Sequence, residues 1–267
     1  MMITRRGFHR RAGLLIAALG TTAAGCALLP PEPLPLTPFG AFTVTVTGGV
    51  AGIFRQLRVT PDDGIGLVLT DSPAAGRIGR QTLDRIGTLL ESEAFRREAA
   101  RPRPDEMRCS DTFVATLRMG ALTARREDPC APSPAPEWDK LTALLQPFWE
   151  GNFEEPLPEA PAPPPILVQE IASGRPTGRR VELGPTGQAT LRTADRVLQT
   201  RRLEAPQLEA LTVLATGPLC RPSRTFDDGF LIRIGDQQPV GPVGNRIGSD
   251  CPELGAIAQL ARTAVDL

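Results

Sequence analysis

Few side chains in this sequence could do chemistry. The chain of 267 residues has one histidine, His9, and five cysteines. His9 lies in a segment that we expect to be removed, so the mature protein would contain no imidazole. Histidine-dependent hydrolysis, Cys-His proteolysis and histidine-bound zinc are therefore excluded for the mature chain. We expect a protein that is not an enzyme, with no catalytic residue, no metal site and no cofactor.

The cysteine count favours an oxidising destination. One of the five, Cys26, directly follows the N-terminal segment. The other four are Cys109, Cys130, Cys220 and Cys251. Four cysteines allow three pairings, and their spacing favours one bridge in each half of the chain, Cys109–Cys130 and Cys220–Cys251. Each bridge would stabilise the fold by roughly 3–4 kcal/mol in the chain-entropy description. A zinc site is disfavoured because the sequence contains no Cys-x-x-Cys pair.

The other reactive side chains are better explained as structural. Asp62-Asp63 and Asp227-Asp228 could act as paired carboxylates or bind calcium, but a glycine follows each pair, which is typical of a turn. Lys140 is the sole lysine. A Ser-Lys dyad would need it buried, whereas we expect it to be solvated in a charged first turn of a helix, beside Asp139.

The charge balance argues against nucleic acid as a partner. The chain has 30 basic and 30 acidic residues, and removal of residues 1–25 leaves 26 against 30. A nucleic-acid-binding domain is usually strongly basic. We therefore expect no nucleic-acid partner, and no residue pattern suggests a small-molecule substrate.

Residues 1–25 have the three parts of an export signal: a basic start, a short apolar stretch and small residues before Cys26. The apolar stretch has about nine residues, whereas a membrane span needs ~20. Its basic start, with Arg5, Arg6 and Phe8, resembles the twin-arginine signal. Ala23-Ala24-Gly25-Cys26 resembles a bacterial lipobox, with alanine where leucine is usual at the first position. We expect lipid attachment at Cys26 and an extracytoplasmic, membrane-anchored protein.

Two proline-rich segments divide the rest of the chain. Residues 26–41 form the anchor cysteine and a stiff tether. Residues 149–165 are acidic and proline-rich, which predicts a linker without a core of its own. The chain therefore divides into a first domain over 42–148 and a second over 166–267. Two linker aromatics, Trp149 and Phe153, are expected to dock within the chain rather than on a partner.

The two domains resemble each other. Residues 77–90 align without a gap on residues 202–215. The coinciding apolar pairs are Ile78/Leu203, Leu83/Leu208, Ile86/Leu211 and Leu89/Leu214. Their spacing is that of an amphipathic helix in each copy. A second match aligns Pro136-Glu137 with Pro252-Glu253, each at the start of a further helix.

Between these helices the apolar period changes to two, which predicts strands. The predicted strands are 42–47, 57–60, 65–69 and 112–119 in the first copy, and 180–183, 188–191 and 230–234 in the second. Each domain is therefore predicted to be α+β: a small antiparallel sheet packed against helices, in the order strands, helix, strands, helix. One apolar face of each sheet should be covered by helices.

The segment Thr47–Ile53, followed by a hairpin, a helix over 81–95 and a strand opening at Cys109–Phe113, resembles the emfourin domain. The resemblance covers roughly residues 42–148 and, more weakly, 166–267, where Ser173–Gly178 replaces the glycine-rich stretch and lacks its Gly-Gly pair. A characterised emfourin domain inhibits thermolysin-type metalloproteases.

The resemblance implies a non-enzymatic protein that binds a protein partner. The candidate partner is a thermolysin-type metalloprotease, and the candidate contact loop is Gly48, Gly49, Val50, Ala51 and Gly52. The alternative is an envelope scaffold or interaction lipoprotein without inhibitory activity.

Overall fold

The computed structural model describes residues 39–49, 52–100, 112–127, 134–157, 162–194, 196–222, 227–244, 247 and 250–265. Several predictions fall on residues outside these ranges. They are the export signal with Arg5, Arg6 and Phe8, the lipid-attachment residue Cys26, the tether up to residue 38, the loop residues Val50 and Ala51, and the cysteines Cys109 and Cys130.

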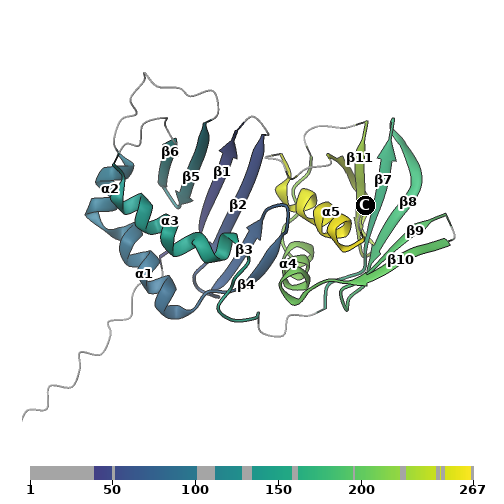
Figure 1. Cartoon of the computed structure of the whole chain (residues 1–267), viewed down its shortest axis with the longest axis horizontal. Helices are drawn as coiled ribbons and strands as arrows, with labels where there is room; N and C mark the ends of the chain where they lie inside the picture. Colours follow the sequence, from purple (N-terminus) through teal and green to yellow (C-terminus); the bar gives the residue numbers. More distant parts are fainter. Residues whose placement is uncertain are drawn as a thin grey trace, which may run out of the picture. The chain divides into compact units, whose positions relative to one another are not determined.

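The chain contains the same order of elements twice, four strands, a helical segment, two strands and a helix (Figure 1). The first repeat comprises β1 (Phe42–Gly48), β2 (Ile53–Thr60), β3 (Ile65–Leu69), β4 (Ala74–Arg77), α1 (Arg80–Glu91), α2 (Glu93–Ala99), β5 (Phe113–Met119), β6 (Leu122–Glu127) and α3 (Pro136–Trp149). The second comprises β7 (Ile166–Ala172), β8 (Arg175–Leu183), β9 (Gln188–Thr193), β10 (Arg196–Arg202), α4 (Ala205–Thr216), β11 (Gly229–Ile234), β12 (Val240–Val243) and α5 (Pro252–Val265).

Each repeat builds a six-stranded antiparallel sheet, and the strand orders are equivalent. Sheet A has the order β4-β3-β2-β1-β5-β6, and sheet B has the order β10-β9-β8-β7-β11-β12. The α+β class and the order strands, helix, strands, helix are therefore confirmed.

Equivalent backbone hydrogen bonds confirm the gapless alignment of the repeats. The N–H of Ile78 donates to the carbonyl of Gly64 at 2.8 Å, and the N–H of Leu203 donates to that of Gly187 at 2.9 Å. Both glycines have a positive φ, +66° and +79°, which glycine adopts without steric cost. Each ties the turn of a hairpin to the start of the following helix.

The helix predicted over 81–95 is in fact two helices. α1 ends at Glu91, and α2 begins at Glu93 after an extended residue, Ser92. The Ser92 hydroxyl accepts a hydrogen bond from the N–H of Phe95 at 3.0 Å, so Ser92 caps the second helix. A serine at this position competes with the helical backbone hydrogen bonds, and the cap it forms begins a new helix.

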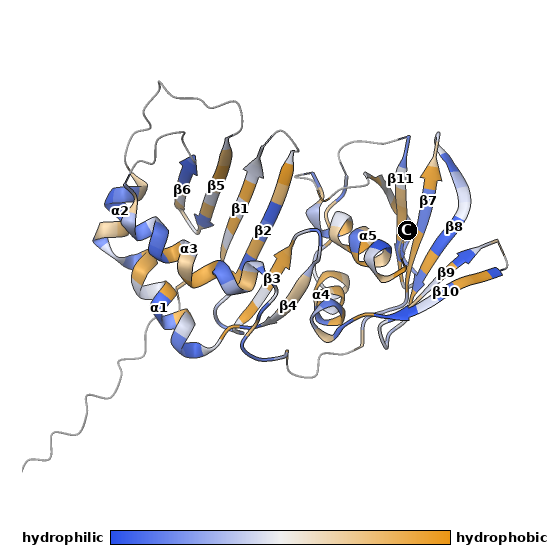
Figure 2. Ribbon diagram, in the orientation of Figure 1, coloured by the Kyte–Doolittle hydropathy of each residue, from blue (hydrophilic) through white to orange (hydrophobic). Residues whose placement is uncertain are grey.

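The first repeat has its own hydrophobic core between sheet A and helices α1, α2 and α3. Its largest fully buried side chains include Phe42, Leu57, Ile86, Phe95 and Phe148. The buried residues of this core occupy every second position of β1 and β2, and they recur at helical spacing along α1 as Leu83, Ile86 and Leu90. Figure 2 shows apolar and polar residues following one another along β2. This is the face of sheet A that the sequence predicts to be covered.

The second core extends into the first repeat, which the local sequence patterns do not predict. Leu67, Leu69 and Ala75, on the other face of β3 and β4, are buried in the same cluster as the residues of sheet B, α4 and α5. Ten of the fourteen residues of α5 are buried. Such a large buried share is typical of a helix that packs on more than one side. The expectation of one covered face per sheet is therefore wrong for sheet A, because α4 and α5 pack between the two sheets (Figure 1).

The predicted linker also packs against the fold. The ring of Phe153 stacks on that of Phe148 with centroids 5.7 Å apart. A Cβ atom added at Gly66 or Gly76 would collide with Phe153, so both glycines make room for it. Trp149 is partly buried against the first core. The predicted docking of both aromatics within the chain is confirmed, and the prediction that this segment joins no core is wrong for its start.

Among the described residues, no helix combines the length and the apolar character that a membrane span requires.

Candidate functional site

The predicted contact loop connects β1 to β2 at one end of sheet A. Gly48 has a φ of +123°, and a Cβ atom there would collide with the carbonyl oxygen of Thr112. The N–H of Gly49 donates to the carbonyl of Thr112 at 3.2 Å, and the N–H of Gly52 donates to that of Gly49 at 3.0 Å. The glycines therefore shape and anchor the base of the loop, whose central residues Val50 and Ala51 lie outside the described part.

The second repeat closes the equivalent hairpin with a shorter turn. β7 ends at Ala172 and β8 begins at Arg175, so only Ser173 and Gly174 connect them. Both have a positive φ, +51° and +71°. The N–H of Ser173 donates to Oδ1 of Asp228, and the N–H of Gly174 to the carbonyl of Asp227, both at 2.8 Å. Gly178, aligned with the loop by sequence, lies inside β8 instead.

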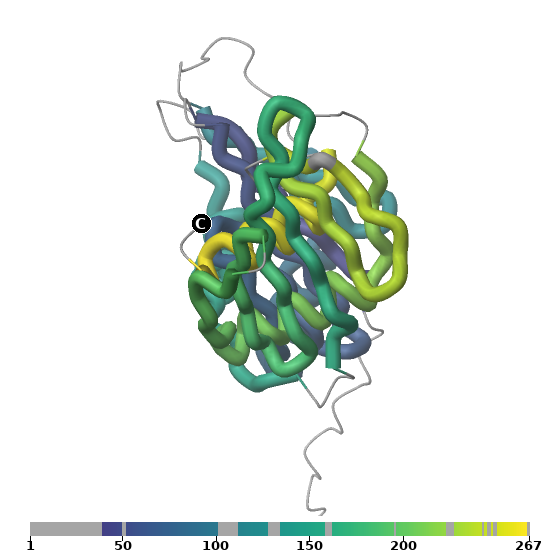
Figure 3. The backbone as a smooth tube through the Cα atoms, turned by 90° about the vertical axis from the view of Figure 1, so that its right-hand side faces the viewer, coloured from purple at the N-terminus to yellow at the C-terminus, as the bar shows by residue number. Residues whose placement is uncertain are grey.

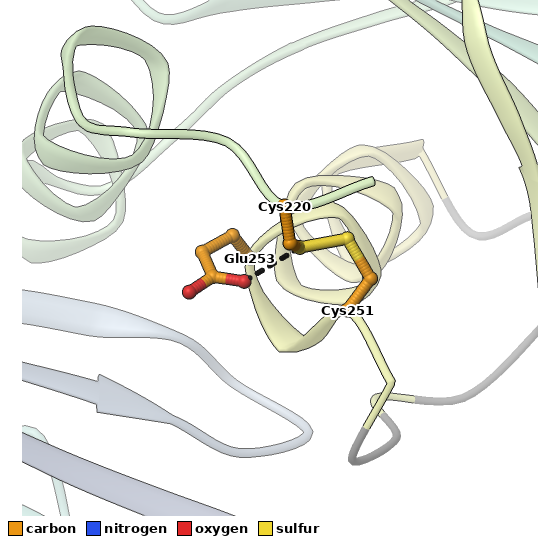
Figure 4. A group of neighbouring side chains, drawn as sticks. All are labelled: Cys220, Cys251 and Glu253. Atoms are coloured by element: carbon orange, nitrogen blue, oxygen red, sulfur yellow. Dashed lines mark hydrogen bonds between the residues drawn. A yellow bond between two sulfur atoms is a disulfide. The ribbon is translucent and has the colours of Figure 1, made fainter. Parts of the chain in front are cut away.

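One of the two predicted disulfides lies within the described residues. Cys220 and Cys251 are joined, with their Cα atoms 5.6 Å apart (Figure 4). Cys251 directly precedes α5, and Cys220 follows α4 along the chain. The bridge therefore connects the two helices that pack between the sheets, and it confirms the predicted pairing in the second half.

A carboxylate approaches this disulfide. Oε2 of Glu253 lies 2.8 Å from Sγ of Cys220, along the dashed line in Figure 4. A sulfur in a disulfide has no hydrogen to donate, so this is a contact in the oxidised protein and a hydrogen bond only in the reduced one. The other oxygen of Glu253, Oε1, lies 2.5 Å from Nη2 of Arg58 on β2.

Cys220, Cys251 and Glu253 are also a geometric candidate for a metal, since their donor atoms lie within 4.8 Å of one another. A thiolate is needed to bind zinc. The disulfide removes both thiolates, and Arg58 neutralises the carboxylate. The oxidised cluster is therefore suited to linking the repeats rather than to holding an ion.

The other reactive residues lie where the sequence predicts. Asp62 and Asp63 are exposed in the turn between β2 and β3, where the N–H of Gly64 donates to the carbonyl of Pro61 at 3.2 Å. Nζ of Lys140 is solvated and lies 2.8 Å from Oε1 of Glu137. Its neighbour in sequence, Asp139, pairs with Arg126 on β6 instead.

The carboxyl group of Glu209 has a perturbed pKa. Burial raises the pKa of Glu209, on α4, above its ordinary value of 4.5. The backbone N–H of Leu157 hydrogen-bonds to this carboxyl group and shifts the pKa in the opposite direction, by less. Because Leu157 belongs to the segment that links the repeats, this contact attaches the segment to the second repeat.

A groove of about 750 Å³ lies on the helical side of the first repeat. Its lining residues come mainly from α1 and α3 and include Asp84, Arg85, Glu137, Lys140 and Leu144. Glu137 and Lys140 pair with each other in it, and Asp84 pairs with Arg80. The charges of Glu137, Lys140 and Asp84 are thus balanced within the chain.

A surface feature outside the sequence-based predictions is strand β10. It lies at one end of sheet B, and six of its seven residues are exposed. Val197 and Leu198 are 52% and 57% exposed, and they are the exposed large hydrophobic residues of the described part of the chain. The sequence contained a signal for this strand, because Arg202, the last residue of β10, aligns with Arg77, the last residue of β4.

Comparison with known proteins finds no matching protein-family model, no matching curated protein and no matching solved structure. The function of this chain is therefore inferred from its own residues.

Proposed function

We propose that this chain is an extracytoplasmic lipoprotein without enzymatic activity that binds another protein through the β1–β2 loop, Gly48–Gly52. By its resemblance to the emfourin domain, the proposed partner is a thermolysin-type metalloprotease, inhibited by occupation of its active-site cleft. Cys26 would carry the lipid, and the proline-rich tether would hold the folded part away from the membrane surface.

The observation that supports a role for this loop is the difference between the two repeats. The second repeat closes the equivalent hairpin with two residues, Ser173 and Gly174. The first repeat uses four, residues 49–52, although the sheet orders are the same. The two hairpins have the same length, since Phe42 pairs with Val59 and Ile166 with Leu183, but the second repeat takes up the other two residues in a register shift between β7 and β8. The first repeat instead displays all four residues at the end of its sheet. Surface loops are a common location of binding sites.

The chemistry available to the loop limits how it could act on a protease. Its residues, Gly49-Val50-Ala51-Gly52, have no ionisable side chain. Any group of the loop that reached a catalytic zinc would be a backbone carbonyl oxygen, since oxygen donors are acceptable zinc ligands. Glycines at both ends of the loop would let the backbone approach the cleft closely.

The test uses the full chain with Cys26→Ser, mixed with thermolysin, and measures peptide hydrolysis. The key variant replaces residues 49–52 by Ser-Gly, the turn that the second repeat already uses. The variant is expected to fold and to lose inhibition by at least about tenfold, or 1.4 kcal/mol of binding free energy. A control with Asp62→Ala and Asp63→Ala, in the turn at the opposite end of β2, should inhibit like the parent.

Full protease activity at a high molar excess of the parent chain would reject the inhibitor proposal. The alternative, an envelope scaffold, would then be examined by cross-linking in intact cells. Envelope assembly components captured by the parent, and equally by the Ser-Gly variant, would support the scaffold and would show that the loop is not its contact.

A further inference from the structure

The two edge strands β4 and β10 occupy the same position in their sheets but differ in what covers them. In the first repeat, the outer edge of β4 is covered by the acidic segment after α3. The N–H of Arg77 donates to the carbonyl of Glu155 at 2.8 Å, and the N–H of Glu154 donates to the carbonyl of Arg77 at 3.1 Å. Arg77 and Glu155 thus form an antiparallel bridge.

Charge complementarity accompanies this bridge. Nη1 of Arg77 lies 4.0 Å from Oε2 of Glu155. The carboxylate of Glu154 accepts hydrogen bonds from the N–H of Gly79 and the hydroxyl of Thr82, each at 2.6 Å. An extended acidic segment therefore adds to a sheet edge that ends in an arginine. This is strand addition within one chain.

In the part of the chain that the structure describes, strand β10 presents the same edge without such a cover. Arg202 pairs with Gln188 on β9 as Arg77 pairs with Ile65 on β3. By this equivalence, the N–H and carbonyl of Arg202 face outward, as those of Arg77 do. Within the described ranges, no strand or bridge pairs with the outer edge of β10. Figure 3, which faces sheet B, shows the strands of this sheet in front of α5.

We propose that the outer edge of β10, Arg196–Arg202, binds an extended acidic segment of another protein, which adds to sheet B as a further antiparallel strand. β10 carries three arginines and no acidic residue. Val197 and Leu198 offer apolar contacts beside Arg196, and Arg202 supplies the counterpart of Arg77. The register shift between Val197 and Gln199 leaves Leu198 without a paired residue on β9, and both apolar side chains are more than half exposed.

A second copy of this chain fits the edge poorly. Antiparallel pairing of two β10 strands centred on Gln199 would place Arg196 opposite Arg202 of the other copy. Like charges directly opposite each other destabilise a strand pair. An acidic strand instead gains a carboxylate for these arginines and backbone hydrogen bonds along the edge.

This inference deepens the proposed binding function, but it concerns a surface separate from the β1–β2 loop. The probe is a fluorescent peptide of seven residues, the length of β10, with the sequence Glu-Val-Glu-Thr-Glu-Val-Glu. Binding to the full chain carrying Cys26→Ser is measured by fluorescence anisotropy, and protection of the β10 amides is measured by hydrogen exchange. A peptide with lysine at every glutamate position tests charge. An acidic peptide with proline at both valine positions tests backbone pairing.

The acidic peptide is expected to bind and to protect the β10 amides, whereas the lysine and proline peptides should bind at least about tenfold more weakly. Arg196→Glu with Arg202→Glu should weaken binding of the acidic peptide at least about tenfold, and Val197→Ser with Leu198→Ser about threefold or more. The matched control is Arg96→Glu with Arg97→Glu on α2, which changes the net charge equally and should bind like the parent.

Equal binding of the acidic and proline peptides would overturn the proposal, since it would indicate attraction without strand pairing. The proposal would also be overturned if the α2 control loses as much binding of the acidic peptide as the variant with Arg196→Glu and Arg202→Glu. The proposal would also be overturned if the parent does not bind the acidic peptide and the β10 variants instead lose binding to phosphatidylglycerol vesicles. Loss of self-association by the β10 variants in ultracentrifugation, with no peptide binding by the parent, would overturn it too. The Ser-Gly loop variant should keep peptide binding, so the failure of one proposal is distinguishable from the failure of the other.

Discussion

Arg58 on β2 and Glu253 in the first turn of α5 form an ion pair that joins the two repeats, with 2.5 Å between Nη2 and Oε1. The side chain of Glu253 is only 14% exposed. Gln56 accepts a further hydrogen bond from Nε of Arg58, which orients the guanidinium. The ion pair therefore lies at the boundary of the repeats, next to the disulfide between Cys220 and Cys251.

Removing Arg58 should destabilise the whole chain. Arg58→Met leaves the carboxylate of Glu253 largely buried without its partner, at a cost of about 1–3 kcal/mol. Urea denaturation followed by circular dichroism measures this. Arg80→Met is the control, because the pair of Arg80 with Asp84 is exposed and contributes about 0.5 kcal/mol or less. Equal effects of the two substitutions would contradict the importance of the ion pair between the repeats.

The carboxylate of Glu154 should stabilise the start of α1, although it lies far from it in sequence. Glu154→Ala removes the acceptor for the N–H of Gly79 and should lower the free energy of unfolding by about 1–2 kcal/mol. The effect should appear as faster hydrogen exchange in the first turn of α1. Glu155→Ala is a control at the next residue, since its side chain makes only a long, exposed contact with Arg77. Unchanged exchange in α1 after Glu154→Ala would count against this cap.

The two repeats should unfold together. Leu69 belongs to the first repeat but is fully buried in the second core, so Leu69→Ala should cost about 2–5 kcal/mol and loosen both repeats. Val68→Ala, on the adjacent residue, removes a side chain from the first core instead. Both variants are expected to show one transition by calorimetry. Two resolved transitions in either variant would mean that the repeats are thermodynamically separate.

The disulfide should stabilise the fold by constraining the unfolded chain. Cys220 and Cys251 are 31 residues apart, for which the chain-entropy description predicts about 3–4 kcal/mol. A variant with serine at both positions should lose that amount in urea denaturation of the oxidised protein. Peptide mapping without reductant should find the Cys220–Cys251 fragment in the parent. Another pairing of Cys220 in that map would reject this connectivity.

The raised pKa of Glu209 predicts a pH dependence of stability. A group whose pKa is higher in the folded than in the unfolded state contributes its full stabilisation at a pH below the unfolded-state pKa. This stabilisation is lost as the pH rises through the folded-state pKa. Glu209→Gln cannot ionise, so its melting temperature relative to the parent should increase from about pH 4 to pH 7. Leu157→Pro removes the N–H that donates to Glu209 and should therefore raise the pKa of Glu209 further. In a chain that keeps Glu209, this substitution should make the loss of stability with rising pH steeper. If the difference in melting temperature between Glu209→Gln and the parent does not change with pH, burial is not the cause of the raised pKa of Glu209.

Much of each repeat could be predicted from local patterns. The alternation in Phe42–Thr47 and the turn residues of Pro61–Gly64 are local signals, and both elements form as predicted. The helical spacing of Leu83, Ile86 and Leu90 likewise matches their burial in α1.

The strands that local patterns do not predict are the four edge strands β4, β6, β10 and β12 and the central strand β7. β4 reads Ala-Ala-Gly-Arg and β12 reads Val-Gly-Pro-Val, so alanine, glycine and proline, which are poor strand formers, occupy much of both. β10 buries too little of either face to show a period of two. These edge strands form because a neighbouring strand offers backbone partners, whereas β7 also buries Ile166, Val168 and Ile171.

The candidate binding surfaces depend on more than local patterns. The glycines of the β1–β2 loop could be singled out from the sequence, because glycine types and spacing are read along the chain. The exposure of Val197 and Leu198 could not, since an apolar pair in sequence is equally compatible with a core. These two side chains are exposed because β10 lies at the end of sheet B, and pairing between distant parts of the chain decides that position.

Periodicity, spacing and turn chemistry along the chain are enough to predict the α+β class, the doubled order of strands and helices and the turn that carries Asp62 and Asp63. Spacing favours the pairing of Cys220 with Cys251 among three possibilities, and the tertiary structure selects it. These local patterns do not predict that the two repeats share a core through Leu67 and Leu69, that the acidic segment covers the edge of β4, or that the equivalent edge of β10 is exposed. Burial and edge pairing are contacts between residues distant in sequence, and such contacts leave little trace in the local pattern of either partner.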